Sequence, residues 1–552
     1  MRRLPRPALL LFCLAFVLAG FVGRAPWKTA DLTAFGYMLE LARGHSDWLA
    51  PRLMGLPLEL DGLLPYWLGA WAIQCAPSWL APDFAARIPF IALLAVSLLA
   101  TWYGTYFLAR SPSAQPVAFA FGGEALPADY ARAIADGGLL AFIACLGLAQ
   151  LSHETTPAQV QLCCAAMVFY AFAALPHRTL GPALAGTLGL AGLALSGAPS
   201  VAVLLGLGGA LLQRLDPEAA SAPPRRAAWA WGLLGMTLLA GALATALNLW
   251  RWRIDLPQAT WVEWRNLLRL LLWFTWPAWP LALWTLWRWR RQLASGSLHR
   301  HLALPIWFAA VALAATFTTT AQERALLLAL PAVAALAAFA LPTLGRSVAA
   351  LVDWFTLLFF SGCAVVVWVH WVALQTGVPA TPAGNIMRQV PGFQASLSWG
   401  LFGLALLATL AWLWLVTWRV GRYRSAIWKS MVLPAGGAAL GWLLLTTLLL
   451  PPVDYARSYL PLVARAQQLW GASTPACVQE HALSRSQIAA FQFHGQLNME
   501  ALTSQAHCPW LLVDKDGLLT LEKATDMNQW ALQGNIAHPS DRDEKVLVFK
   551  RR

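Results

Sequence analysis

About thirteen apolar runs, each close to the ~20 residues that cross a bilayer, follow one another between residues 8 and 450. A chain with 59% hydrophobic and 12% charged residues cannot cover so many runs with polar surface. Its 31 tryptophans cluster at the ends of these runs, as anchors at a membrane interface do. The sequence therefore predicts an all-α polytopic membrane protein. The predicted spans lie near residues 8–24, 88–108, 138–152, 157–175, 180–197, 199–213, 227–248, 267–288, 302–320, 325–344, 349–372, 399–418 and 430–450.

The distribution of Arg and Lys predicts which loops face the cytoplasm, where these residues are enriched. With the N-terminus inside, outer loop 152–156 holds no basic residue and outer loop 373–398 holds only Arg388. Outer loop 249–266 departs from the trend, with Arg251, Arg253 and Arg265. An odd number of spans places the C-terminus outside, and a miscount of one would reverse that. The first run could also be a cleaved signal peptide, but it is long for one and is favoured as the first span.

Residues 451–552 have ordinary polarity and form a predicted domain of their own, separate from the transmembrane domain 1–450. The segment WLLVDKDGLLTL predicts two strands around a Lys-Asp-Gly turn, and KVLVF predicts a terminal strand. About 100 residues suffice for a small α/β domain with its own core. Because the chain is predicted to end outside, this domain is expected to be extracytoplasmic.

Two of the eight cysteines, Cys477 and Cys508, lie in this C-terminal domain. An outward-facing domain is oxidised, so a Cys477–Cys508 disulfide is the favoured interpretation. The alternative is a zinc site built from Cys477, His481, His507 and Cys508. Its spacing matches no common metal pattern.

The first outer loop, residues 25–87, is far more polar than the segments that follow it. Between residues 32 and 42 the apolar residues recur at helical spacing, which predicts a short amphipathic helix with Asp31 near its N-terminus. Asp31 could simply cap this helix and complement its dipole. The chain carries no Gly-rich phosphate loop, no GxGxxG after a strand and no HExxH, so nucleotide-binding and zinc-protease chemistry are not indicated.

The order of four motifs adds a resemblance to this reading. Asp31, then LARG with DWLAPRLMGLP, then YWLGA, then FAARIP resembles the lipid-linked-sugar glycosyltransferases of the GT-C class. The closest resemblance is to the branch of bacterial aminoarabinose transferases and protein O-mannosyltransferases. The chain departs from that branch twice: Leu32 stands where a second acidic residue is usual, and Asp61-Gly62-Leu63 stands where Lys-Pro-Pro is frequent.

The resemblance implies a GT-C-like fold with a C-terminal extracytoplasmic domain, in the bacterial inner membrane. It also implies transfer of a sugar from a polyprenyl-phosphate donor to an extracytoplasmic acceptor, namely lipid A, another glycan or a protein. Asp31 falls on the acidic active-site position, where a carboxylate can accept the proton of the acceptor hydroxyl or orient the acceptor. No nucleic acid is expected as a partner, and dependence on a divalent metal ion is left open.

A departing lipid phosphate needs Arg or Lys nearby, and the acceptor needs polar groups. Glu59 and Asp61 could bind the acceptor or a divalent ion, while several of the basic residues could instead form salt bridges or anchor the interface. The candidate substrate-binding residues are Arg52, Glu59, Asp61, Tyr66, Arg87, Glu323, Arg324 and Arg388.

The competing interpretation is a transporter or flippase of lipid-linked glycans. Transporters often show paired repeats and charges in the middle of spans, whereas here the charges concentrate in one outer loop. A catalytically inert relative that serves as a scaffold is a further alternative, because Leu32 and Asp61 depart from the family pattern.

Overall fold

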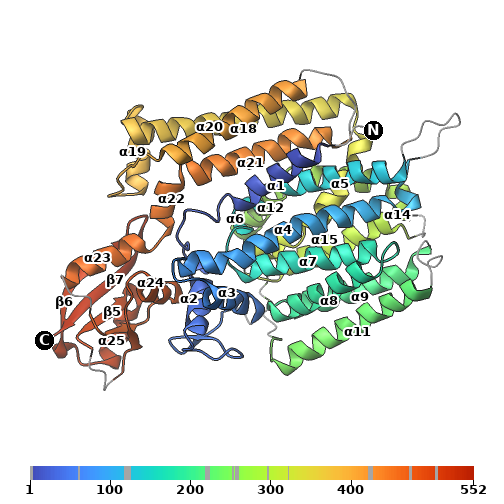
Figure 1. The fold of residues 1–552 in the computed structure, drawn as a ribbon. Helices are drawn as coiled ribbons and strands as arrows, with labels where there is room; N and C mark the ends of the chain where they lie inside the picture. The colour runs from blue at the N-terminus through green and yellow to red at the C-terminus, as the bar shows by residue number, and fades with distance from the viewer. Residues whose placement is uncertain are drawn as a thin grey trace.

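The computed structural model describes residues 4–59, 62–116, 126–217, 224–250, 254, 256, 260–294, 298–320, 322–420, 427–471, 475–503 and 508–552. Apolar helices lie side by side in one elongated bundle, and the C-terminal domain is attached at one end (Figure 1). The helices of the bundle are α1 (Arg6–Leu18), α4 (Pro82–Ala109), α5 (Pro127–Ala144), α7 (Pro157–Ala174), α8 (Leu180–Leu195), α9 (Pro199–Leu215), α11 (Pro224–Ala246), α13 (Ala278–Arg288), α15 (Arg300–Phe317), α17 (Leu330–Ala340), α18 (Arg346–Thr376), α20 (Trp399–Val420) and α21 (Val432–Thr447). Shorter helices connect them: α6 (Leu148–Leu151), α12 (Trp261–Phe274), α14 (Arg290–Ala294), α16 (Gln322–Leu327) and α19 (Ala380–Gln389).

Among the described residues, seven helices are long and apolar enough to cross a membrane by length and composition, and four shorter ones are apolar. The seven are α4, α7, α11, α15, α18, α20 and α21, and the shorter ones include α1, α8 and α9. Each predicted run falls on a helix of the bundle, so the prediction of a polytopic helical protein is confirmed at the level of fold.

Some predicted spans have the wrong limits. The run at 8–24 extends past the end of α1 at Leu18. The run at 138–152 is α5, which begins at Pro127 and ends at Ala144. The sequence did not predict its first half, because that half contains polar residues. One of them, Asp136, accepts a hydrogen bond from Trp102 Nε1 at 2.8 Å. The run at 267–288 is two helices, because the segment Thr275–Pro277 separates α12 from α13.

Close approach of helices is achieved with small residues in the centre of the bundle. A Cβ added at Gly189 in α8 would lie 2.8 Å from the carbonyl oxygen of Cys164 in α7. Such contacts replace the hydrophobic driving force that is missing between helices in lipid.

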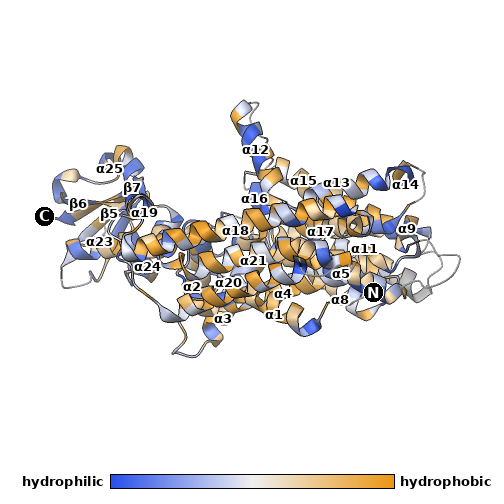
Figure 2. Cartoon of the chain, turned by 90° about the horizontal axis from the view of Figure 1, so that it is seen from above, coloured by the Kyte–Doolittle hydropathy of each residue, from blue (hydrophilic) through white to orange (hydrophobic). Residues whose placement is uncertain are grey.

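Helix α12 differs from its neighbours in direction and in surface. In Figure 2 it stands across the direction of the long helices and projects from the bundle. Trp261, Trp264, Leu268 and Leu272 lie at helical spacing and are exposed. Its C-terminal residue Phe274 is buried, and the Phe274 carbonyl accepts a hydrogen bond from the Gly147 N–H at 2.9 Å.

The outer loop after α1 folds into α2 (Ala30–Ala42), a two-stranded hairpin of β1 (Arg52–Leu53) and β2 (Leu56–Pro57), and α3 (Leu64–Cys75). The prediction of an amphipathic α2 is wrong in one respect, because every residue from Asp31 to Leu41 is buried. The C-terminal domain covers the remaining face: Phe35 packs edge-on against Phe493 at 4.7 Å, and Gly36 faces Ala489. The sequence of the loop alone does not reveal this second cover.

The C-terminal domain begins with α22 (Leu450–Arg457) and α23 (Leu460–Trp470) and contains a five-stranded mixed sheet with the order β4-β3-β5-β7-β6. Strands β3 and β5 are parallel, whereas β7 is antiparallel to both β5 and β6. The bounds are β3 (Val478–His481), α24 (Arg485–Phe493), β4 (Met499–Ala501), β5 (Trp510–Asp514), α25 (Leu518–Ala524), β6 (Trp530–His538) and β7 (Asp541–Arg551).

The predicted strands of this domain are half right. WLLVD is β5 and KVLVF lies in β7, but LLTL begins helix α25 rather than a second strand. The Asp514 side chain accepts the N–H of Asp516 at 3.0 Å and starts a helical turn over Lys515–Gly517. That turn leads directly into α25, so the Lys-Asp-Gly segment does not reverse the chain into a hairpin.

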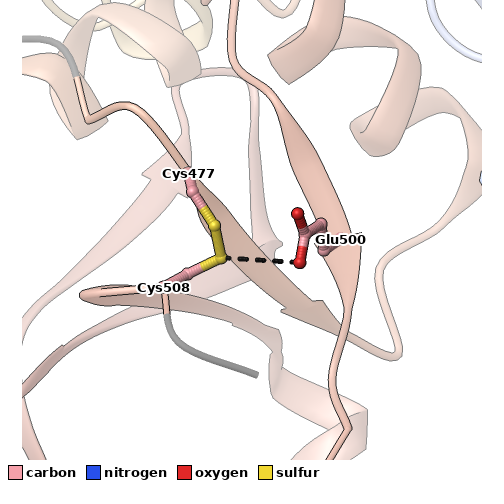
Figure 3. The surroundings of a disulfide bond; sticks show 3 residues. All are labelled: Cys477, Glu500 and Cys508. Atoms are coloured by element: carbon pink, nitrogen blue, oxygen red, sulfur yellow. Dashed lines mark hydrogen bonds between the residues drawn. A yellow bond between two sulfur atoms is a disulfide. The ribbon is translucent and has the colours of Figure 1, made fainter. Parts of the chain in front are cut away.

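Cys477 and Cys508 are joined as a disulfide between the start of β3 and the segment before β5, with 5.1 Å between their Cα atoms (Figure 3). The Glu500 carboxylate lies 3.9 Å from the Cys508 Sγ. With the two sulfurs bonded, neither serves as a zinc thiolate. Of the two histidines in the alternative zinc site, His481 contacts Thr520 at 2.9 Å and His507 lies outside the described residues.

Candidate active site

A pocket of about 380 Å³ opens where the start of α2, the α6–α7 connection and α16 meet. Helices α2, α6 and α16, which contribute to its lining, lie toward the end of the bundle that carries the C-terminal domain (Figures 1 and 2). Three carboxylates and two cations face it. The residues that line it are Lys28, Thr29, Ala30, Asp31, Leu146, Gly147, Gln150, Leu151, Glu154, Phe274, Glu323 and Arg324.

The Asp31 carboxylate is buried and accepts hydrogen bonds from three residues of two segments, the α1–α2 and α6–α7 connections. Its Oδ2 accepts from Arg24 at 2.6 Å and from the Trp27 N–H at 3.2 Å. Its Oδ1 accepts from both the N–H and the hydroxyl of Thr155, at 2.7 and 2.5 Å. None of these donors belongs to α2, so these bonds tie the helix to its neighbours and do not cap it.

Burial alone would raise the pKa of Asp31. The Arg24 and Arg87 guanidinium groups and the Thr155 hydrogen bonds outweigh it and lower that pKa from 3.8 to about 2. The carboxylate is therefore ionised at neutral pH and is a weak proton acceptor.

Arg24 and Arg87 are the two guanidinium groups that stabilise the Asp31 anion. The Arg24 guanidinium also donates to the carbonyls of Gly20 and His153, both at 2.6 Å. Arg87, at the start of α4, donates to the Arg24 carbonyl at 2.7 Å and to Asp83 at 3.1 Å. These bonds fix the α1–α2 connection against the α6–α7 connection, as a rigid support for a site requires.

Glu154 is the second buried carboxylate of the pocket. It pairs with Arg324 at 3.1 Å and accepts from Gln150 at 3.2 Å. Burial raises the pKa of Glu154, and the attraction of Arg324 offsets only part of that rise. The two carboxylates therefore differ: Asp31 is held as an anion, whereas Glu154 is the better proton acceptor.

Lys28 stands at the mouth of the pocket and joins it to the C-terminal domain. Its backbone N–H donates to the Arg457 carbonyl at 2.8 Å. Its ammonium donates to Glu544 at 3.1 Å and to Asp541 at 3.3 Å, both on β7. The neighbouring Trp27 donates through Nε1 to Asp454 at 2.9 Å.

The structure brings only part of the predicted site together. Asp31, Glu323 and Arg324 line the pocket, and Arg87 donates to the carbonyl of Arg24, the partner of Asp31. Asp61 lies outside the described residues.

The other predicted residues lie elsewhere. Arg52 is exposed in the hairpin and donates to the Gly55 carbonyl, and Glu59 pairs with Arg485 of α24 at 3.2 Å. Tyr66 is buried against Tyr37. Arg388 is exposed on α19 and donates to Asn385.

Sequence reasoning missed Arg24, Lys28, Gln150 and Glu154. One signal was present: Ser152-His153-Glu154-Thr155-Thr156 is a wholly polar connection between two apolar runs. All five of its residues are buried, which a short exposed loop would not show.

Among the described residues, the only three His, Cys, Asp or Glu side chains with ligand atoms within 4.8 Å of one another, as a metal ion would require, are Cys477, Glu500 and Cys508. Two of these three are the disulfide, and they belong to the C-terminal domain rather than to the pocket.

No protein-family model and no curated protein matches the chain. Solved structures do match it, and two of them are of one protein. The crystal structure of ArnT from Cupriavidus metallidurans in the apo state has a TM-score of 0.60 and 14% identity, covering 99% of this chain and 98% of that chain. The structure of the same protein bound to undecaprenyl phosphate has a TM-score of 0.59 and 13% identity over the same shares. The chain therefore has the ArnT fold over nearly its whole length, and the predicted resemblance to the GT-C class is confirmed at the level of fold.

Proposed function

We propose that the protein transfers a sugar from a polyprenyl-phosphate-linked donor to a hydroxyl acceptor at the outer face of the membrane. The observation that carries the proposal is the pocket, which combines buried carboxylates of different proton affinity with two cations. The bound undecaprenyl phosphate of the ArnT structure supports a lipid phosphate as part of the donor.

In the proposed reaction the acceptor oxygen forms a bond to the anomeric carbon of the sugar. The bond between that carbon and the phosphate oxygen breaks, and its electron pair leaves with the polyprenyl phosphate. The proton of the acceptor hydroxyl is transferred to a carboxylate. No oxidant, reductant or nucleotide is required.

The two buried carboxylates then have separate roles. Glu154, whose pKa is raised, accepts the proton of the acceptor hydroxyl. Asp31, whose pKa is about 2, remains ionised and stabilises the positive charge that develops on the sugar ring. Asp31 is thus proposed as a catalytic residue, as the sequence predicted, with an electrostatic rather than a proton-accepting role.

The departing phosphate gains one negative charge, and Arg324 and Lys28 are the two cations that line the pocket. Guanidinium and ammonium groups both bind phosphate oxygens strongly. The polyprenyl chain is proposed to lie against the exposed apolar side chains of the bundle. The acceptor is proposed to be an extracytoplasmic lipid, glycan or protein, with the protein in the bacterial inner membrane, its N-terminus cytoplasmic and its C-terminus periplasmic.

The test is a donor assay on the purified full-length protein in detergent. A polyprenyl-phosphate-linked sugar is supplied with a lipid acceptor fraction, and free polyprenyl phosphate is measured. Release that depends on acceptor and on Glu154 supports the transferase. Donor lipid that crosses a vesicle membrane without cleavage of the sugar–phosphate bond would instead identify a transporter.

A further inference from the structure

The two cations of the pocket are neutralised in different ways. Arg324 pairs with Glu154, which itself lines the pocket. Lys28 pairs with Asp541 and Glu544, which belong to the C-terminal domain and do not line it. One pocket cation is therefore neutralised by carboxylates from a separate part of the chain, more than 500 residues away in sequence.

The two carboxylates on Lys28 are held unequally. Glu544 also accepts hydrogen bonds from Tyr459 and from Gln487, the latter at 3.2 Å. Gln487 is itself fixed in the capping box of α24 with Ser484. Asp541 has 46% of its side chain exposed, against 17% for Glu544. Glu544 is thus tied to two other side chains of the C-terminal domain, whereas Asp541, which also accepts the Asp543 N–H at 3.3 Å, is the more exposed of the two.

Lys28 can still bind a further anion. An ammonium has three N–H donors, and two account for the contacts to Asp541 and Glu544. Lys28 is one of the residues that line the pocket, and this third donor is available for an anion there. An anion in that position would lie on the same ammonium as Asp541, and two negative groups sharing one cation repel each other.

We propose that Lys28 is the anion-binding group at the mouth of the pocket and that Asp541 of the C-terminal domain competes with the anion for it. The anion is of the phosphate class. That it is the phosphate of a polyprenyl donor rests on the proposed function. The C-terminal domain then completes the site and sets its affinity for donor and product.

Substitutions can separate competition from a structural role. Asp541→Asn removes the competing charge and keeps a polar group of the same size. Asp543→Asn is the matched control. Asp543 is an exposed aspartate two residues along the same strand, and its substitution removes one negative charge, as Asp541→Asn does. Lys28→Gln removes the cation but keeps the backbone N–H that donates to Arg457.

The measurement is the affinity of the purified full-length protein for undecaprenyl phosphate and, separately, for inorganic phosphate, at low salt. We expect Asp541→Asn to tighten binding of the phosphate group about 3- to 10-fold and Lys28→Gln to weaken it about 10-fold or more. In the Lys28→Gln background, Asp541→Asn should have no effect. Asp543→Asn should resemble the wild type.

Two results would overturn the proposal: unchanged or weaker binding in Asp541→Asn, or an equal gain with and without Lys28. If inorganic phosphate follows the expected pattern but undecaprenyl phosphate does not bind, the Lys28 site stands and the proposed donor is wrong. If the wild type binds neither, both are wrong.

Discussion

The two ends of the helical bundle each bury an Arg–Asp pair, and the pair at one end lies beside the pocket of the candidate site. At the end that carries the C-terminal domain, Arg24 and Asp31 are paired at 2.6 Å, with 1% and 2% of their side chains exposed. At the opposite end, where α14 leads into α15 (Figure 2), Arg300 and Asp216 are paired at 3.5 Å, with 3% and 1% exposed. By burial and charge the two pairs are equivalent.

What differs is their surroundings. Asp31 is one of three carboxylates facing a cavity of about 380 Å³ that also contains two cations. Arg300 donates in addition to the Ser111 hydroxyl at 3.2 Å, and so it joins the start of α15 to the end of α4. A buried ion pair by itself therefore indicates a joint between segments. The site is distinguished by the second carboxylate, which has a different proton affinity, and by the space beside it.

Which end of the bundle faces outward can be tested with reporter fusions, which give an all-or-none result. We expect a reporter that is active only outside the cytoplasm to be active when fused after Arg552 and silent when fused at Leu293, within α14. The opposite pattern would place the Arg300–Asp216 end outside and would remove the outer-face site.

Glu154→Gln should have the largest effect on catalysis, because it removes the proposed proton acceptor and keeps the shape of the side chain. We expect transfer to fall by ~10²–10⁴, the usual contribution of a positioned acid–base group. Release of polyprenyl phosphate measures this directly. Glu59→Gln is the control, since Glu59 lies on the same side of the molecule but pairs with Arg485 outside the pocket, and it should stay near the wild-type rate.

The two buried pairs can be compared by matched substitutions. Asp31→Asn and Asp216→Asn each remove a buried negative charge that is paired with a guanidinium, so each should lower the free energy of unfolding by about 3–5 kcal/mol. Only Asp31→Asn should also reduce turnover per folded molecule. Equal turnover in the two variants would show that Asp31 is a joint like Asp216.

The C-terminal disulfide gives a third difference between the ends, because only the outer compartment is oxidising. We expect alkylation under denaturing, non-reducing conditions to leave Cys477 and Cys508 unlabelled until a reductant is added. The bridge closes a separation of 31 residues, which should contribute about 3–4 kcal/mol in the chain-entropy model. Free labelling of both thiols would rule the bridge out, and zinc content should then be measured.

Acid should weaken the Arg24–Asp31 pair by a smaller amount. The pKa of Asp31 is lowered from 3.8 to about 2 in the folded protein, so its contribution is present above pH ~4 and is lost as the pH falls through about 2. The expected loss is about 2 kcal/mol. Unfolding of the wild type and of Asp31→Asn in detergent between pH 2 and 6 measures it. The same acid sensitivity in both proteins would contradict the assignment.

The sequence predicted the helical bundle well, because an apolar run is a local signal that does not depend on its neighbours. It failed where polar residues continue a helix, as in the first half of α5, and where a helix-compatible turn resembles a hairpin, as at Lys515–Gly517.

The site was predicted less completely, since its residues meet only through the fold. Asp31 was predicted from a motif and from its position near the N-terminus of a helix. Its donor Thr155 is 124 residues away, and no spacing in the chain links the two. Conversely, Arg52 and Glu59 lie in the same polar loop as Asp31, yet they interact locally or with α24 and not with the pocket. The high density of charged residues in this loop therefore indicated where the site lies, but not which residues line it.

Helix α12 has a further consequence for how the molecule sits in its lipid surroundings. It lies across the long helices (Figure 2). Trp261, Trp264 and two leucines are exposed at helical spacing along it, and Arg265 and Arg269 are exposed as well. Indole rings and arginine heads both settle among lipid headgroups, so we expect α12 to lie at headgroup depth. Phe274, the last residue of α12, also lines the pocket. We therefore expect α12 to hold the candidate site at that depth, so that a thicker or thinner bilayer would displace the far ends of the long helices before it displaced the pocket.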